Sequence, residues 1–400
     1  MRRLPGIGLV SASGLAASGL SFVVFVLAGR RLSTVAFADF AAIWGLIFGA
    51  ASILGAFELE AARRSARSSG YLGNLSNLAL LTSVALSAIA LVGAPLIARI
   101  VSTEVLPALA VAFAMAFYPL FYVTRGRIAG LDRLTQYAAV SLLEGLLRPL
   151  TLVALGTTAA WQFTWATASG AAAWLPWGPS LARASVGAEP PENATQESSS
   201  ETAKKVGVLM SGNIAGAILI TGMPATLTVV LGDADGVGIA TAVVLASVSR
   251  APLILLQSVY GLLVPWFVRS GIVDVAAWVR KHWLVLAVGF AALTVTGGLV
   301  LIVAVDLLFG ERYRVGIPVA VVFMFGALLL GILQIMTAGL VARDLHRLVQ
   351  IMWWSTTATA LCVLMLGRIV GMSPIWAASI AQSSGPLVGL AIASRSLRAG

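Results

Sequence analysis

Twelve long apolar runs dominate this sequence and restrict its fold more than any other feature. Each is near the length of about 20 residues that an α-helix needs to cross the hydrocarbon core of a bilayer. The runs cover approximately residues 6–28, 37–57, 76–98, 106–123, 136–156, 159–179, 206–231, 237–264, 283–305, 316–342, 348–367 and 373–394. The pattern therefore predicts an all-α polytopic membrane protein with about twelve transmembrane helices.

The composition excludes a soluble protein. Of the 400 residues, 59% are hydrophobic and only 10% are charged, whereas a soluble surface needs far more charge. The net charge of +10 raises the alternative of nucleic-acid binding. We reject it because the basic residues lie in small groups between the apolar runs, a pattern that orients membrane proteins.

The distribution of basic residues tests the number of spans. With a cytoplasmic N-terminus, six of the 26 lysines and arginines fall in external loops, two inside spans and eighteen in cytoplasmic segments. Such a bias is expected from the positive-inside rule, and an error of one span would destroy it downstream. Both termini are therefore predicted to be cytoplasmic, and the protein is expected in the plasma (inner) membrane of a bacterium.

A polar segment divides the chain into two halves. Residues 185–205 are acidic and rich in Pro and Ser, which is typical of a flexible linker. We expect a six-helix bundle at 1–182, a cytoplasmic linker at 183–205 and a second six-helix bundle at 206–400. Two such halves are common in transporters, where they surround a central cavity.

Charged residues inside the oily runs are the candidates for a site. Tyr137, Ser141, Glu144 and Arg148 recur at helical spacing, which puts them on one face of the span 136–156. Charges in lipid cost several kcal/mol and usually face an internal cavity. We interpret this face as the lining of a polar interior; a structural ion pair between Glu144 and Arg148 is the alternative.

The second half contains one deep cation, Arg250, in the same span as Gln257. No acidic residue lies in that span. Arg250 therefore needs a partner from elsewhere: Glu144, backbone carbonyls or an anionic substrate. At the end of the second span, Glu60 can pair along the helix with Arg63 or Arg64, and an ion pair without a transport role is the favoured interpretation there.

Other chemistries lack the residues they need. The single cysteine, Cys362, excludes a disulfide within the chain and a cysteine-based metal site. The sequence has no P-loop, no H-E-x-x-H motif and no paired Asp motif for metal-dependent transfer. We expect no enzymatic activity, no catalytic residue, no metal and no cofactor.

Four places resemble one family, the polysaccharide flippases of the multidrug/oligosaccharidyl-lipid/polysaccharide exporter superfamily. They are L-A-G-R-R-L-S-T-V-A-F-A-D-F at 27–40, the loop and helix at 125–148, S-R-A-P-L at 249–253 with P-W-F-V-R at 265–269, and F-G-E-R-Y at 309–313. The likeness covers nearly the full chain, and the order of the motifs carries it.

The resemblance implies a transporter that moves a polyprenyl-diphosphate-linked oligosaccharide or related glycan precursor to the outer leaflet by alternating access. Arg148 and Arg250 would then attract the diphosphate or an acidic sugar. Arg30 and Arg31 would lie at the external mouth of the cavity, and Arg64 and Arg125 at the cytoplasmic mouth. The implied partners are this glycan substrate, membrane lipids and glycan-assembly proteins, with no nucleic acid.

Two alternatives remain open at this point. A drug or cation exporter of the same superfamily would want an acidic cavity, whereas the cavity candidates here are net basic. A non-transporting scaffold of a glycan-assembly complex would have no cavity or a sealed one.

Overall fold

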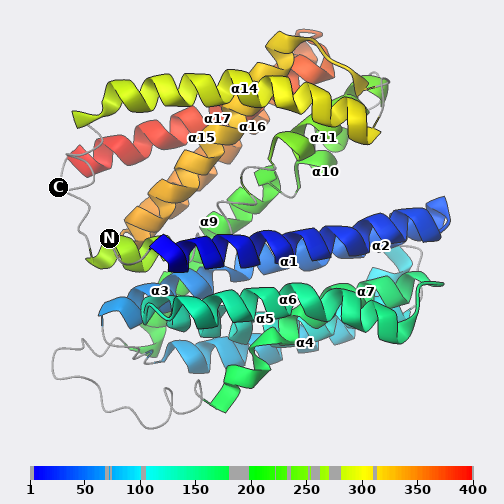
Figure 1. Cartoon of the computed structure of the whole chain (residues 1–400), viewed down its shortest axis with the longest axis vertical. Coiled ribbons are helices and arrows are strands. Elements are labelled where there is room, and N and C mark those ends of the chain that lie inside the picture. The colour runs from blue at the N-terminus through cyan, green and yellow to red at the C-terminus, as the bar shows by residue number, and fades with distance from the viewer. Residues whose placement is uncertain are drawn as a thin grey trace. The chain divides into compact units, whose positions relative to one another are not determined.

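The computed structural model describes residues 4–67, 72, 74–100, 105–179, 198–220, 222–231, 236–250, 253, 262–269, 281–309 and 313–398. Every regular element in these residues is a helix (Figure 1). Ten helical segments in this part of the chain are long and apolar enough to cross a membrane. Each overlaps one of the twelve predicted spans, so the all-helical membrane fold is confirmed.

The chain divides into two compact units. Unit 1 contains residues 1–210 and 257–268, and unit 2 contains residues 211–256 and 269–400. Unit 1 contains α1 (Leu4–Arg31), α2 (Thr34–Leu54), α3 (Ala56–Arg67), α4 (Leu75–Ile100), α5 (Val105–Gly130), α6 (Leu134–Leu155), α7 (Ala160–Ser169) and the 3₁₀ helix η1 (Gly170–Trp177). Helix α9 (Ser199–Ile220) begins in unit 1 and ends in unit 2. Unit 2 also contains, among its described residues, α10 (Met223–Leu231), α11 (Gly236–Ser249), α14 (Trp283–Phe309), α15 (Ile317–Ala342), α16 (His346–Ile369) and α17 (Pro374–Arg398).

Small residues let the helices of unit 1 approach closely. Helix α6 runs along α1, and Gly145 lies directly against Ala17, where a Cβ atom would overlap the neighbouring backbone. Gly126 on α5 lies in the same way against α3 near Glu58. Such contacts are the usual means of helix association in lipid, because the hydrophobic effect does not drive it there. These contacts hold α3, α5 and α6, the three helices that carry most of the buried charges.

The predicted sixth span, 159–179, is not one helix. It consists of α7 followed by η1. The turn before α7 is closed by Gln162, whose Oε1 accepts from the backbone N–H groups of Thr158 and Ala159 at 2.6 and 2.8 Å, while its Nε2 donates to Leu155 O at 2.6 Å. This side chain satisfies donors that a helix N-terminus leaves free.

The predicted seventh and eighth spans also differ from the prediction. The seventh, 206–231, is divided into α9 and α10, and Gly222 N donates to Ala217 O at the break. The eighth, 237–264, begins as α11, but most of its second half lies outside the described residues.

The predicted linker, 183–205, lies outside the described residues up to 197. Its last residues were wrongly assigned to a flexible segment, because Ser199 to Lys205 form the first two turns of α9. The reason is a capping box: Ser198 Oγ accepts from Glu201 N at 3.2 Å, and Glu201 Oε2 accepts from Ser198 N at 3.0 Å.

Candidate functional site

The polar face predicted for residues 136–156 exists on α6 and points into unit 1. Tyr137, Ser141 and Arg148 are buried, and the Glu144 side chain is 16% exposed. The rest of the helix places apolar residues such as Val153 and Leu150 at the surface. The burial of these side chains agrees with the predicted interior face of the helix, and its role as the lining of a cavity stays a prediction.

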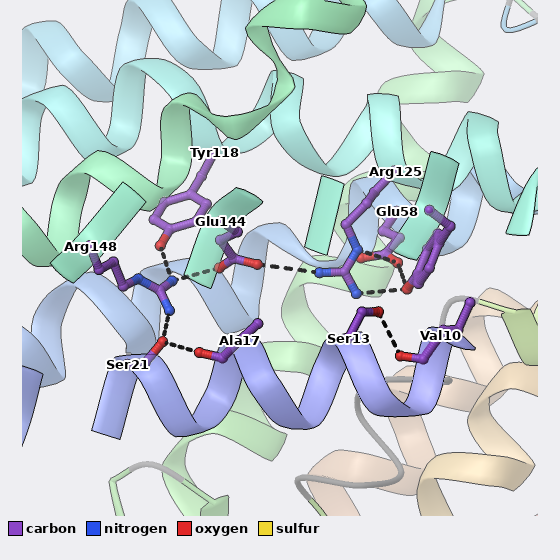
Figure 2. A network of polar contacts seen from close by, with 10 residues as sticks. Val10, Ser13, Ala17, Ser21, Glu58, Tyr118, Arg125, Glu144 and Arg148 are labelled. Atoms are coloured by element: carbon purple, nitrogen blue, oxygen red, sulfur yellow. Dashed lines mark hydrogen bonds and ion pairs between the residues drawn. The ribbon is translucent and has the colours of Figure 1, made fainter. Parts of the chain in front are cut away.

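Arg148 lies in a closed setting of mixed polar and aromatic groups (Figure 2). Its Nη2 donates to Glu144 Oε1 at 2.6 Å and lies 3.5 Å from the Tyr118 hydroxyl, and its Nη1 donates to Ser21 Oγ. The guanidinium carbon is 5.0 Å from the centre of the Phe48 ring, a cation–π distance. Four helices, α1, α2, α5 and α6, thus hold one cation in place.

A glycine makes room for this guanidinium. Gly170 begins η1, and a Cβ atom there would lie 2.8 Å from Arg148 Nε and 3.1 Å from Nη2. Among the described residues, the buried Nε of Arg148 has no hydrogen-bond partner. One donor of the cation is therefore still unused.

Arg125, on α5, is the second cation of this site. Its Nε lies 3.2 Å from Glu58 Oε1, its Nη2 donates to the Tyr137 hydroxyl at 2.6 Å, and its Nη1 lies 3.6 Å from Glu144 Oε2. Tyr137 in turn donates to Glu58 Oε1 at 2.8 Å. The Arg125 side chain is only 13% exposed.

These contacts join into one continuous network from α3 to α1. Glu58, Arg125, Glu144 and Arg148 alternate in sign along it, as Figure 2 shows. Two guanidinium groups face two carboxylates, so the four side chains are neutral as a set. Buried charges need this kind of pairing, because an uncompensated charge in a low-dielectric interior costs several kcal/mol.

A second charged cluster lies nearby on α3. Glu60, which is fully buried, accepts from Arg63 at 2.6 and 2.8 Å and from Arg64 Nε at 2.7 Å. The predicted pairing along the helix is thus confirmed for both arginines. Arg64 also donates to Leu72 O at 3.3 Å and to Thr202 Oγ1 at 3.1 Å, so it connects α3 with the start of α9.

In the described part of unit 2, the buried cation Arg250 has no carboxylate partner. Arg250, buried at the end of α11, donates to Ile220 O at 2.7 Å and to Gln382 Oε1 at 3.3 Å. Ile220 ends α9, and the last carbonyls of a helix are free acceptors at the negative end of its dipole. Of the partners expected from the sequence, backbone carbonyls are therefore the ones found within unit 2.

Gln382 is held from its other side. Its Nε2 donates to Phe323 O at 3.0 Å and lies 3.2 Å from Ser249 Oγ. The glutamine thereby presents its carbonyl oxygen to Arg250. Within the described part of the chain, the Nε of Arg250 is buried without a partner.

The remaining predicted site residues are scattered. Arg30 and Arg31 are exposed at the end of α1, and Gln257 lies outside the described residues. Arg125, expected with Arg64 at a cavity mouth, lies in the network with Glu144. No group of three or more His, Cys, Asp or Glu residues that could hold a metal ion occurs in the described ranges.

Sequence reasoning missed several members of the two sites. Tyr118 and Gln382 were not among the candidates, the sequence left packing and cavity lining equally open for Ser21, and it did not decide whether Glu58 reaches the interior. A signal existed for Tyr118, since it lies seven residues before Arg125, or two helical turns, and therefore on the same face of α5.

No family model matches the chain. The uncharacterized protein Rv3630 of Mycobacterium tuberculosis is 26% identical over 96% of this chain and 91% of its own length. The uncharacterized protein Rv1510 of the same species is 30% identical over 67% of this chain and 60% of its own length. The likeness to Rv3630 extends along nearly the whole chain, and the likeness to Rv1510 along two thirds of it.

Solved structures of transporters share the fold. A mutant of the Vibrio cholerae MATE transporter VcmN matches with a TM-score of 0.72, 13% identity and coverage of 99% of this chain and 96% of that one. An outward-facing multidrug resistance MATE transporter of the MOP superfamily gives 0.71, with 14% identity and coverage of 98% and 96%. A MOP superfamily transporter from Pyrococcus furiosus gives 0.69, with 13% identity and the same coverage. At such identities the likeness shows the fold.

Proposed function

We propose that this chain, which has the fold of MATE transporters, moves a polyprenyl-diphosphate-linked oligosaccharide or related glycan precursor across the bacterial plasma membrane by alternating access. The observation that supports a transport function is the fold, which is matched over 99% of the chain by a MATE transporter. Folds of this kind work by the movement of two repeats around a binding site.

The choice of an anionic substrate rests on Arg250. In the described part of the chain this guanidinium contacts only neutral acceptors, Ile220 O and Gln382 Oε1, and keeps an unused Nε–H. Its positive charge is therefore available to an anion. A diphosphate offers several acceptor oxygens and forms strong charge-assisted hydrogen bonds with guanidinium groups.

Unit 1 would take part through exchange of partners. Arg148 is already paired with Glu144, and Glu144 also faces Arg125. A phosphate oxygen that replaces Glu144 on Arg148 leaves that carboxylate with Arg125, so no charge is left alone. In this proposal Arg30, Arg31 and Arg64 attract the head group at the two mouths, and the lipid tail stays in the bilayer.

A drug or cation exporter is the second candidate, and one observation favours it. Glu58 and Glu144 are carboxylates enclosed in unit 1, where a cation could replace Arg125 as their partner. In the Pyrococcus furiosus MOP superfamily transporter, the reverse polarity of the binding pocket suggests a different function for that protein. Pocket polarity is therefore the property that should separate the two candidates here.

The decisive experiment compares two arginines of unit 2 that cap helix ends. Arg250→Gln removes the buried cation, and Arg368→Gln is the matched control, since Arg368 is exposed and donates to Val230 O at 2.8 Å near the end of α10. The measurement is the flipping rate of a labelled polyprenyl-diphosphate glycan in proteoliposomes. We expect Arg250→Gln to lower the rate by about tenfold or more, because a hydrogen bond to a charged group contributes about 1.5–3 kcal/mol.

The control should stay within about twofold of the wild type, since an exposed interaction of this kind contributes about 0–1 kcal/mol. Arg148→Ala should also abolish flipping. Normal glycan flipping by both Arg148→Ala and Arg250→Gln would remove these residues from the mechanism. Transport of an organic cation in place of the glycan would establish the second candidate.

A further inference from the structure

A second polar cluster lies in unit 2 where α9 contacts α16. Ser211 Oγ accepts two hydrogen bonds, from Gln350 Nε2 at 2.9 Å and from the Trp354 indole N–H at 3.0 Å. A hydroxyl oxygen has two acceptor positions and one hydrogen to donate. Both acceptor positions are therefore occupied, and among the described residues neither the Ser211 hydroxyl hydrogen nor Gln350 Oε1 has a partner.

The cluster opens to the outside of the unit. The Trp354 side chain is 41% exposed, and Gln350 and Ser211 are half-buried. Because its N–H is fixed on Ser211, the indole has a defined orientation while part of its ring surface stays free. Arg347 lies seven residues before Trp354, on the same face of α16, and is also exposed.

The two helices have other contacts that hold them together. Gly212 lies against the backbone of Gln350, and Gly216 lies against the Trp353 ring, so that a Cβ atom at Gly216 would be 3.3 Å from that ring. Deeper in the same interface, Thr357 Oγ1 donates to Ala215 O at 2.8 Å. Packing of α9 on α16 therefore does not depend on the outward-facing side chains alone.

This combination of groups fits a sugar ring. A pyranose has an apolar C–H face, which stacks on an aromatic ring, and a rim of hydroxyls, each both donor and acceptor. Trp354 offers the ring, Gln350 Oε1 an acceptor and the Ser211 hydroxyl a donor. A lipid tail could use only the ring and would leave the two polar groups unpaired in an apolar setting, which is costly.

We propose that Ser211, Gln350 and Trp354 form a subsite for a sugar ring of the glycan, with Arg347 beside it for a phosphate or acidic substituent. This inference rests on the proposed function, since it assigns a place to the glycan part of that substrate. The subsite supplies selectivity for the sugar, whereas Arg250 attracts the diphosphate.

The test measures binding of two lipids to the full chain in detergent. One is a polyprenyl diphosphate without sugar, and the other carries one N-acetylglucosamine. Dissociation constants come from the ligand-dependent shift of the thermal unfolding midpoint, which rises by mass action when a ligand binds the native state. Trp354→Leu is compared with Trp376→Leu, a matched control whose tryptophan is 39% exposed in the same unit.

For the wild type and the control we expect the sugar-bearing lipid to bind about tenfold tighter, since two net hydrogen bonds and a stacked ring correspond to about that ratio. In Trp354→Leu the two constants should agree within about twofold, with sugar-free binding unchanged. Ser211→Ala should reduce the ratio less, because the ring remains.

A ratio near one in the wild type would overturn the subsite and leave the proposed function standing. A ratio unaffected by Trp354→Leu, with a lower unfolding midpoint without ligand, would assign the cluster to packing alone. Binding of neither lipid would overturn the proposed function and the subsite together.

Discussion

The α5–α6 hairpin of unit 1 and the α15–α16 hairpin of unit 2 have the same turn conformation, but their interior side chains differ. Asp132 and Asp344, which are 212 positions apart, both have a left-handed backbone, with φ of 59° and 67°. In each turn the next residue closes the helix end: Arg133 N donates to Ile128 O at 3.1 Å, and Leu345 N to Leu340 O at 3.0 Å. This is the same C-terminal cap in both units.

Aligning the hairpins on these turns reveals how the interiors differ. The aligned pairs are Arg125 with Thr337, Tyr137 with Val349, Glu144 with Thr356 and Arg148 with Ala360. The charged network of unit 1 thus has neutral counterparts in unit 2, where Trp353 Nε1 donates to Thr337 Oγ1 at 3.0 Å. The backbone is repeated while the chemistry is not, so the polar groups of unit 1 are not needed to form such a hairpin.

The first prediction removes the shared carboxylate of the network. Glu144→Ala leaves Arg148 and Arg125 with less compensation and should lower the free energy of unfolding by about 3–5 kcal/mol, the cost of breaking a buried pair. The aligned change Thr356→Ala removes one hydrogen bond to Met352 O, at 2.8 Å, and should cost about 1 kcal/mol. Unfolding of the two purified variants in mixed detergent gives both values. Equal losses in the free energy of unfolding would mean that the charged network contributes no more to stability than its neutral counterpart in unit 2.

How far the sequence could anticipate this network depends on helix length. The pair of Glu144 and Arg148 could be predicted because its members are four residues apart on one helix. The position of Arg125 could not, since the predicted span ended at residue 123 whereas α5 continues to Gly130. Hydropathy ends a span where charges begin, but a helix continues when those charges find partners.

Contacts between residues that are distant in sequence could not be predicted either. Glu58 and Arg125 are 67 positions apart, and Arg250 and Gln382 are 132 apart. A single sequence contains no signal that joins such positions, because the contacts depend on which helix faces which. Arg250 also donates to the backbone carbonyl of Ile220. Every residue has such a carbonyl, so the sequence could predict this acceptor only by predicting where the helix ends.

The second prediction exchanges the packing residues of the two hairpins. Gly145 on α6 lies against Ala17, and its aligned counterpart is Thr357 on α16. Gly145→Thr forces α1 and α6 apart and should cost about 1–3 kcal/mol of stability, as overpacking does. Gly93→Ala on α4 is the control, since a Cβ atom there meets nothing within 4 Å. A stable Gly145→Thr variant would mean that α1 can move away without loss.

The reciprocal change should have a smaller effect. Thr357→Gly removes the hydrogen bond to Ala215 O, at a cost of about 1 kcal/mol. It also adds backbone freedom to the helix, but this costs only about 0.3 kcal/mol because threonine is itself a poor helix former. It creates no overlap, so the native packing of α16 should persist. If Thr357→Gly lowered the stability more than Gly145→Thr, the contact of α1 with α6 would be less sensitive to substitution than the contact at Thr357.

The third prediction tests the feature that the hairpins share. An L-residue in the left-handed region costs about 1–2 kcal/mol unless its side chain offsets the strain, which Asp and Asn do better than Ala. Asp132→Ala and Asp344→Ala should therefore each lower the free energy of unfolding by about 1 kcal/mol. The glycine variants should stay within about 0.5 kcal/mol of the wild type, because glycine adopts positive φ freely. At residue 344 both substitutions also remove the contact of 3.0 Å between Asp344 Oδ1 and His346 Nδ1, so the difference between the alanine and glycine variants measures the backbone effect there. If alanine and glycine were equally well tolerated at both turns, the common backbone would not be what keeps Asp in these positions, and the correspondence between the two hairpins would lose its physical basis.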